Sequence, residues 1–242
     1  MRRLQAVLGV PRLGIYGGTF DPPHRGHLFV AREAHREAAL DALLWVPARC
    51  SPHKAEGATP GEVRAELVEL CLVDARAAED PAAEVAVVWR GELERPGPSY
   101  TVETVRALVE AREGLWRATG ARPVAPELVF VMGADQLDSI ERWAEVDALF
   151  ELARPVVVDR ASEGVNDAQA AERRAARLAH LAACAQDGRL APETAERLTT
   201  GCLATGRLPV SSTALRRSGA GGDATTPLVA QRIADLGLYV ER

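Results

Sequence analysis

Residues 17–27 (GGTFDPPHRGH) join an apolar strand-like segment to a helix-like segment, and this junction constrains the fold more than any other feature. Residues 13–16 before it read LGIY, and residues 28–40 after it have the composition of a helix. Two glycines at the end of a strand let the backbone approach a ligand closely and adopt positive φ. The first N–H groups of the following helix lack partners within the helix, and its dipole favours negative charge. The junction therefore predicts a loop that binds phosphate.

His24 and His27 lie three residues apart with Gly26 between them, so both imidazoles can face one anion. The segment lacks the Lys-Ser/Thr pair of a Walker loop and the third glycine of a dinucleotide-binding fingerprint. The alternative is a plain turn in which the two histidines cap the helix. The strand–loop–helix setting favours phosphate binding over that alternative.

Length and composition limit the classes of protein that the chain can belong to. The chain has 242 residues, 47% of them hydrophobic and 26% charged, which suits one large globular domain or a domain with a lobe. Its net charge of −5 predicts no surface for nucleic acid, so phosphate recognition has to be local. No apolar stretch reaches membrane-spanning length and residues 1–10 lack a cleavage site, so we expect a cytoplasmic protein with no membrane partner. The spacing of the cysteines matches neither a disulfide framework nor a zinc site; they are Cys50, Cys71, Cys184 and Cys202.

Strand-like and helix-like segments alternate along much of the chain. The expected strands are residues 12–16, 42–47, 84–89, 127–132 and 155–158. This alternation predicts an α/β fold, a doubly wound parallel sheet of Rossmann-like type with a small C-terminal helical part. The expected regions are a loose N-terminal extension at 1–11, an α/β core at 12–160, a solvated helical insertion at 161–206 and a C-terminal part at 207–242. Thr226 as N-cap with Pro227 as the first helical residue predicts a final helix.

A second candidate phosphate site lies in the C-terminal part. Ser211, Ser212 and Thr213 offer hydroxyl and N–H groups at an expected helix start, and Arg216 follows about one turn later. The alternative is a simple Ser/Thr helix cap. The presence of the first phosphate loop favours the binding interpretation.

Several segments together resemble the bacterial nicotinate-mononucleotide adenylyltransferases, a family of the T/HxGH nucleotidyltransferase superfamily. They are residues 17–27, the PSYT of 98–101, the GAD of 133–135, Trp143 and the SSTALR of 211–216. The resemblance extends over residues 13–158 and 210–239. The chain departs from the family in its N-terminal extension, in Val210 and Leu215 where isoleucines are usual, and in a longer region at 162–206.

The resemblance implies a catalytic pair, His24 and His27, which neutralise charge on the phosphates, and two sets of binding residues. The residues implied for ATP are Gly17, Gly18, Thr19, Phe20, His24, Gly26, His27, Gly133, Asp135, Ser211, Ser212, Thr213 and Arg216. The residues implied for the acceptor are Lys54, Ser99, Tyr100, Thr101, Trp143 and Ala144. In the family the carboxylate matching Asp135 holds the ribose hydroxyls, and the tryptophan matching Trp143 stacks on the pyridine ring. The alternative for Trp143 is a place in the core beside Ile140 and Val146.

The activity implied by the resemblance is transfer of the adenylyl group of ATP to nicotinate mononucleotide, which yields nicotinate adenine dinucleotide and pyrophosphate in NAD biosynthesis. Mg²⁺ would accompany ATP, and the sequence identifies no dedicated protein ligands for it. One alternative is another adenylyl- or cytidylyltransferase of the same fold, with nicotinamide mononucleotide or phosphopantetheine as acceptor. A second alternative is a nucleotide-binding regulatory module without turnover.

Overall fold

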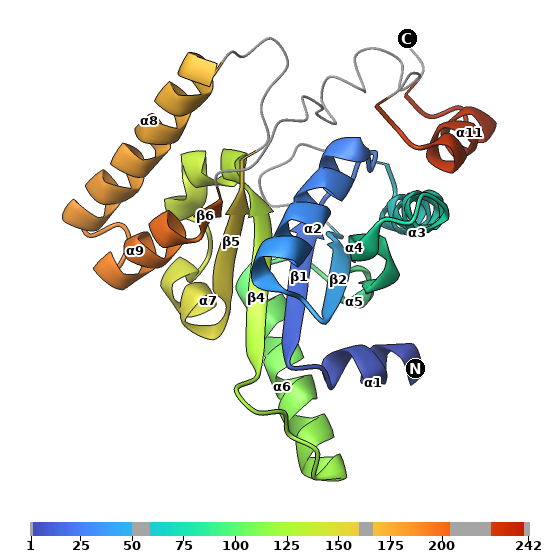
Figure 1. The fold of residues 1–242 in the computed structure, drawn as a ribbon, viewed down its shortest axis with the longest axis horizontal. Helices are drawn as coiled ribbons and strands as arrows, with labels where there is room; N and C mark the ends of the chain where they lie inside the picture. The colour runs from blue at the N-terminus through green and yellow to red at the C-terminus, as the bar shows by residue number, and fades with distance from the viewer. Residues whose placement is uncertain (1, 50–58, 160–166, 204–223, 240–242) are drawn as a thin grey trace.

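A single six-stranded parallel sheet forms the centre of the computed structural model, which describes residues 2–49, 59–159, 167–203 and 224–239 (Figure 1). The strands are β1 Arg12–Gly18, β2 Ala42–Pro47, β3 Ala86–Val88, β4 Glu127–Gly133, β5 Arg154–Val158 and β6 Cys202–Leu203. Their order across the sheet is β3-β2-β1-β4-β5-β6, and each of these neighbouring pairs is parallel. The predicted doubly wound α/β fold is confirmed.

Helices cover both faces of the sheet (Figure 1). They are α1 Arg2–Leu8, α2 Arg25–Ala38, α3 Gly61–Ala77, α4 Pro81–Glu84, α5 Gly91–Glu94, α6 Thr101–Thr119, η1 Ala134–Arg142, α7 Val146–Leu152, α8 Asp167–Gln186, α9 Pro192–Thr200 and α11 Pro227–Asp235. One core cluster joins α2, α3 and α4 to the sheet, and another joins α1, α6, α7, α8 and α9 to its other face. Strand β2 (ALLWVP) is buried along its whole length, because a strand covered on both faces needs apolar residues at every position.

Gly14 shows how closely the layers approach each other at the middle of β1. A Cβ at this position would lie 2.6 Å from Leu40 and 2.7 Å from Leu43. Those separations are far below van der Waals contact, so a larger residue would force the ends of both leucine side chains to move.

The N-terminal extension is held more firmly than the sequence suggested. It forms α1, with Val7 and Leu8 buried, and α1 packs near α6. The buried Arg112 of α6 donates hydrogen bonds to the carbonyl oxygens of Leu8 at 3.1 Å and Val10 at 2.6 Å. The expectation of a loose extension is therefore wrong, because an arginine distant in sequence binds its backbone.

The region after β5 also differs in detail from the expectation. Helices α8 and α9 were anticipated, but β6 adds a strand to the sheet and pairs with β5. Leu181, Cys184 and Leu198 are fully buried, so this region is only partly a solvated insertion. The proposed limits of the four regions stay predictions.

The edge strand β3 differs from the expectation, and the final helix agrees with it. Strand β3 is shorter than the expected 84–89, because Asp80 caps a helical turn through Ala82 N–H at 3.0 Å just before it. The final helix α11 begins at Pro227 as predicted and packs against α3. No helix in the described ranges combines the length and the apolar character needed to cross a membrane.

Candidate active site

The loop between β1 and α2 ends in a reciprocal cap made by two histidines. His24 is the N-cap residue of α2, and its Nδ1 accepts a hydrogen bond from the N–H of Gly26 at 3.0 Å. Nδ1 of His27 accepts a hydrogen bond from the N–H of His24 at 3.1 Å. The two rings lie 3.8 Å apart between centroids, tilted by 32°. The hydrogen bonds of the helix-capping alternative are thus present, and phosphate binding by the same two side chains stays a prediction.

That cap determines where the imidazole protons lie. Because Nδ1 of each ring accepts a backbone N–H, the proton of the neutral ring is assigned to Nε2. His24 is fully buried and His27 is 9% exposed, so both rings are held rigidly at the start of α2. Two oriented N–H donors at a helix N-terminus suit a phosphate group.

The Phe20 side chain supports the ring of His27. Its ring packs edge-on against His27 at 5.0 Å between centroids, and it also contacts Tyr16 and Trp45. Gly18 is required because the Phe20 ring folds back over it, so that a Cβ would lie 2.9 Å from Cζ of Phe20. Phe20, predicted among the ATP residues, has its side chain only 2% exposed and supports the loop from below.

Arg64 of α3 links three loops at the edge of the sheet. Its guanidinium donates to the carbonyl oxygens of Thr59 at 2.7 Å, Ala48 at 2.6 Å and Arg49 at 3.2 Å, and also to that of Thr19. The side chain is 1% exposed. Sequence reasoning missed Arg64, although a charged residue among the apolar positions of α3 was a usable signal.

The C-terminal part reaches the same loop through Tyr239. The Tyr239 hydroxyl donates to Oδ1 of the buried Asp21, and Thr59 Oγ1 donates to the Tyr239 oxygen at 2.9 Å. The N–H of Arg25, the first residue of α2, donates to the carbonyl of Ala224 at 2.9 Å. These contacts bring residues 224–239 to the start of α2. The predicted Ser211, Ser212, Thr213 and Arg216, and likewise Lys54, lie outside the described residues.

The segment around Ser99 is tied to the chain that leaves β2. Ser99 Oγ accepts from the N–H of Arg49 at 3.1 Å, and Nη1 of Arg49 donates to the carbonyl of Arg95 at 2.6 Å. Tyr100 is the N-cap residue of α6 and Thr101 is its first residue, so the first-turn N–H groups of this helix begin here.

Below that helix start lies a buried polar pair that the sequence did not reveal. Thr104 Oγ1 donates to Oε1 of Glu92 at 2.6 Å and accepts from Arg95 at 2.5 Å. Burial raises the pKa of Glu92, while Thr104, Ser99 and Arg95 act in the opposite direction. This network positions residues 95–100 against the first turn of α6.

Asp135 and Trp143 lie at the two ends of η1, which follows β4. Because β1 and β4 are adjacent parallel strands, their carboxyl ends meet at one edge of the sheet. Helix η1 therefore begins beside the loop between β1 and α2 that carries His24 and His27, called the histidine loop below. Asp135 is exposed and accepts from Gln136 at 2.9 Å. Trp143 is half-buried, with its ring edge-on to Phe130 at 5.9 Å between centroids and 81° between planes. One side of the Trp143 ring contacts the core and part of the side chain stays exposed, so stacking on the pyridine ring stays a prediction.

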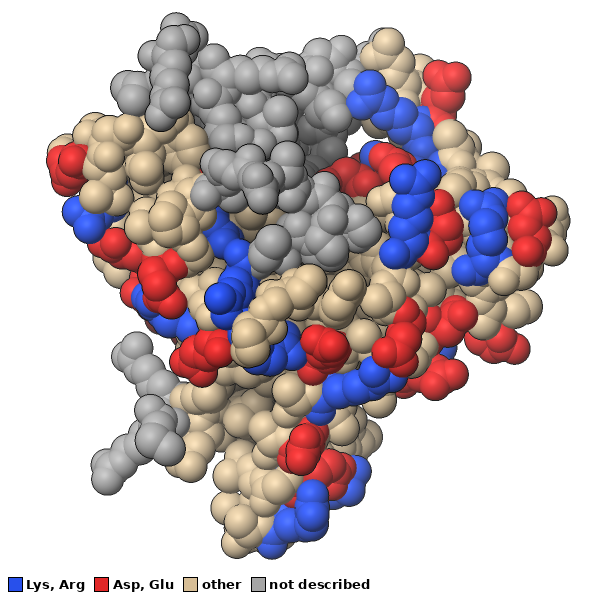
Figure 2. Space-filling model, turned by 180° about the vertical axis from the view of Figure 1, so that it is seen from behind, with Lys and Arg blue, Asp and Glu red and all other residues tan. Residues whose placement is uncertain are grey.

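Charges elsewhere on the surface are mixed. On the face drawn in Figure 2, basic and acidic side chains alternate among the described residues. Ion pairs such as Arg106–Glu145, at 2.5 Å, join neighbouring elements. This pattern agrees with the expectation that phosphate recognition is local.

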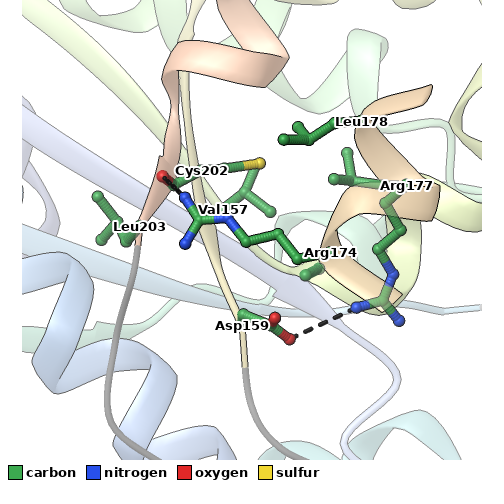
Figure 3. Close-up of a pocket in the computed structure, with 9 residues that line it drawn as sticks. Val157, Asp159, Arg174, Arg177, Leu178, Cys202 and Leu203 are labelled. Carbon is green, nitrogen blue, oxygen red and sulfur yellow. Dashed lines mark hydrogen bonds and ion pairs between the residues drawn. The ribbon is translucent and has the colours of Figure 1, made fainter. Parts of the chain in front are cut away.

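A small, mostly apolar cavity lies behind the start of η1, between β5, β6 and α8 (Figure 3). Arg177 of α8 points to Asp159 at its mouth, at 3.4 Å, and also contacts Asp138 of η1 at 2.9 Å. Arg174 donates to the carbonyl of Cys202 at 3.3 Å. Helix α8 therefore braces η1, and with it the position of Asp135.

Comparison with known proteins gives consistent results. The model of the cytidylyltransferase-like family matches residues 15–218. A probable nicotinate-nucleotide adenylyltransferase of Thermus thermophilus is 41% identical over 151 residues, which are 62% of this chain and 69% of that protein. The nicotinate-nucleotide adenylyltransferase of Bacillus subtilis is 35% identical over 150 residues, again 62% and 69%.

A probable nicotinate-nucleotide adenylyltransferase of Geobacillus kaustophilus is 37% identical, and the match spans only 61% of its length. Among solved structures, the nicotinic acid mononucleotide adenylyltransferase of Plasmodium falciparum complexed with NaAD superposes with a TM-score of 0.60. That match covers 95% of this chain and 98% of the other at 15% identity, so it supports the fold alone.

Proposed function

The chain belongs to the cytidylyltransferase-like family, and within it we propose that the chain transfers the adenylyl group of ATP to nicotinate mononucleotide. The products are nicotinate adenine dinucleotide and pyrophosphate. The first of these is an intermediate of NAD biosynthesis, which is the expected role of the chain. The observation that carries the proposal is the paired histidine cap at the start of α2, in a chain whose relatives bear the name of this activity.

The reaction needs positioning and charge stabilisation more than covalent chemistry. A phosphate oxygen of nicotinate mononucleotide attacks the α-phosphorus of ATP, and the bond from that phosphorus to the oxygen bridging to the β-phosphate breaks. The electron pair of that bond leaves with pyrophosphate. His24 and His27 donate from Nε2 to the phosphate oxygens, and their Nδ1 atoms stay engaged with the backbone throughout.

The remaining site residues take the roles that the family resemblance implies. Asp135, exposed at the start of η1, would accept hydrogen bonds from the ribose hydroxyls of ATP. Trp143 would stack on the pyridine ring, and the N–H groups near Thr101 and Ala144 would bind its carboxylate. Lys54 would contact the acceptor phosphate. Ser211, Ser212, Thr213 and Arg216 would bind the β- and γ-phosphates.

Mg²⁺ fits this site as an ion carried by ATP. Asp21 is the acid within the histidine loop, and its carboxylate already accepts hydrogen bonds from Tyr239 and from the N–H of Thr59. We therefore assign the ion to phosphate oxygens and water, which Mg²⁺ prefers to keep. Its chemistry would be to neutralise charge on the phosphates. A cytoplasmic location and the absence of nucleic-acid or membrane partners stay predictions.

The decisive experiment measures pyrophosphate release from ATP with three acceptors: nicotinate mononucleotide, nicotinamide mononucleotide and phosphopantetheine. We expect nicotinate mononucleotide to be favoured in kcat/KM by on the order of 10²-fold, because donors placed for a carboxylate are mismatched by an amide NH₂. Equal kcat/KM for the two mononucleotides would contradict the acceptor assignment. ATP binding without turnover of any acceptor would favour a regulatory module.

A further inference from the structure

Three side chains with metal-binding atoms meet away from the residues assigned to the nucleotides. Glu141 lies in the last turn of η1, and His180 and Cys184 lie one turn apart on α8. Oε2 of Glu141 is 3.1 Å from Nε2 of His180, and Sγ of Cys184 is 3.5 Å from the same nitrogen. One ligand atom from each residue lies within 4.8 Å of the other two.

The arrangement is unsuited to nucleophilic catalysis. In a nucleophile–base–acid chain, the nucleophile and the orienting carboxylate contact opposite nitrogens of the imidazole. Cys184 and Glu141 instead both approach Nε2 of His180, and Nδ1 lies 4.0 Å from the sulfur. Three ligand atoms within 4.8 Å of one another are close enough to share a metal ion.

The separations agree with tetrahedral zinc. An ion about 2.3 Å from sulfur and about 2.1 Å from nitrogen holds those atoms about 3.6 Å apart, and holds nitrogen and carboxylate oxygen about 3.4 Å apart. The observed 3.5 Å and 3.1 Å are close to these values, but Sγ of Cys184 is also 4.0 Å from Nδ1 and so lies beside the imidazole, which means that the His180 ring must turn to place its Nε2 lone pair toward the ion. Cysteine, histidine and carboxylate are also the ligand types that zinc uses.

Burial and the charges of the ligands suit an ion at the same point, while the two arginines beside Glu141 oppose it. Cys184 is fully buried, the Glu141 side chain is 10% exposed and the His180 side chain is 32% exposed. Oε1 of Glu141 is near Arg142 at 3.6 Å and Arg189 at 3.9 Å, which leaves Oε2 directed to the histidine. A thiolate and a carboxylate together would balance the charge of a divalent cation.

We propose that Glu141, His180 and Cys184 bind one zinc ion, with water as the fourth ligand on the exposed side of His180. Such an ion would join α8 to the last turn of η1, the element that carries Asp135 in its first turn and leads into Trp143. The sequence concealed this site because Cys184 has no nearby cysteine, and Glu141 lies 39 residues from His180. The proposal does not depend on the adenylyltransferase activity.

Binding must displace the thiol proton of Cys184. Cysteine binds zinc as the thiolate, so zinc binding should release a proton and weaken as the pH falls. Proton release on zinc addition, measured in weakly buffered solution, is therefore an independent readout of thiolate coordination.

Cobalt(II) titration of the metal-free full chain tests the site directly. We expect one equivalent to produce a thiolate-to-cobalt charge-transfer band in the near ultraviolet, which zinc then abolishes by displacement. Cys184→Ala should lose the band. Cys202→Ser should keep it, because Cys202 is a half-buried cysteine outside the cluster. Absence of the band from the native chain, or its persistence in Cys184→Ala, would overturn the proposal.

A second variant tests the site even if Cys184→Ala fails to fold. Glu141→Gln keeps the shape of the side chain, and it should weaken cobalt binding at least about tenfold, the smaller end of the effect of removing even an outer partner. Glu151→Gln, an exposed residue of α7, is the matched control and should bind cobalt as the native chain does. Equal affinity of the two variants would also overturn the proposal.

Discussion

Replacing Arg64 by lysine is the sharpest test of how this site is assembled. The guanidinium uses three nitrogens in three directions: Nε to Thr59, Nη1 to Thr19, and Nη2 to Ala48 and Arg49. A lysine ammonium is a single point donor and cannot occupy all three positions. Arg64→Lys keeps the charge but releases at least one of the loops.

The size of the effect follows from those contacts. A buried carbonyl that loses its partner costs about 1–3 kcal/mol. With two carbonyls released and part of the loss recovered by water, we expect a decrease of about 2 kcal/mol in the free energy of unfolding. That loss corresponds to a fall of about 4–8 °C in Tm for a chain of this size. Displacement of the histidine loop by about 1 Å should lower kcat/KM by about 10²-fold.

Arg76→Lys provides the matched control on the same helix. Arg76 donates to the carbonyls of Ala83 at 2.9 Å and Ala86 at 2.7 Å, which hold α4 and β3 and not the histidine loop. Thermal denaturation should show a similar loss of stability in both variants. Pyrophosphate release, measured well below either Tm, should be impaired only in Arg64→Lys. Native kcat/KM in Arg64→Lys, or an equal fall in Arg76→Lys, would refute the assignment of Arg64 as a positioning residue.

Three further predictions follow from the remaining geometry. His27→Ala should lower kcat by about 10²–10³-fold, because the phosphate loses a hydrogen-bond donor. The same variant should lower Tm by about 2–4 °C, because the helix loses part of its cap. An unchanged kcat in steady-state assays would show that His27 has no role in the mechanism. Trp143→Ala should raise KM for nicotinate mononucleotide about tenfold and leave KM for ATP unchanged, whereas Trp116→Ala, at a buried tryptophan of α6, should change only stability. Equal KM effects of both variants would assign Trp143 to the core alone. Burial raises the pKa of Cys71 from 9.0 to about 12, so its contribution to stability is complete below pH 9 and is lost as the pH rises toward 12. Cys71→Ala should therefore show a flatter decline of urea-unfolding free energy over that window, and iodoacetamide should modify native Cys71 at about pH 8 only after unfolding; labelling at equal rates in native and unfolded chains would contradict this.

Local sequence carried enough information to predict the sheet and the histidine loop. Strand β2 reads as an unbroken apolar run, and only a strand covered on both faces tolerates that composition. The cap on α2 is made by His24, Gly26 and His27, which are close in sequence, so their geometry is encoded within one turn. The same geometry is compatible with both the capping and the phosphate-binding interpretations, so phosphate binding stays a prediction.

The tertiary structure decided the features that depend on contacts between distant segments. The sequence shows Arg64 among the apolar positions of α3 but does not show its partner Thr19, which lies 45 positions away. Strand β6 has two residues, too few to show any alternation, and it forms because β5 offers a free edge. The extension before β1 is ordered by Arg112, which lies 104 positions from Leu8. In each case the free energy comes from a partner that chain folding brings close, so no local pattern could identify that partner.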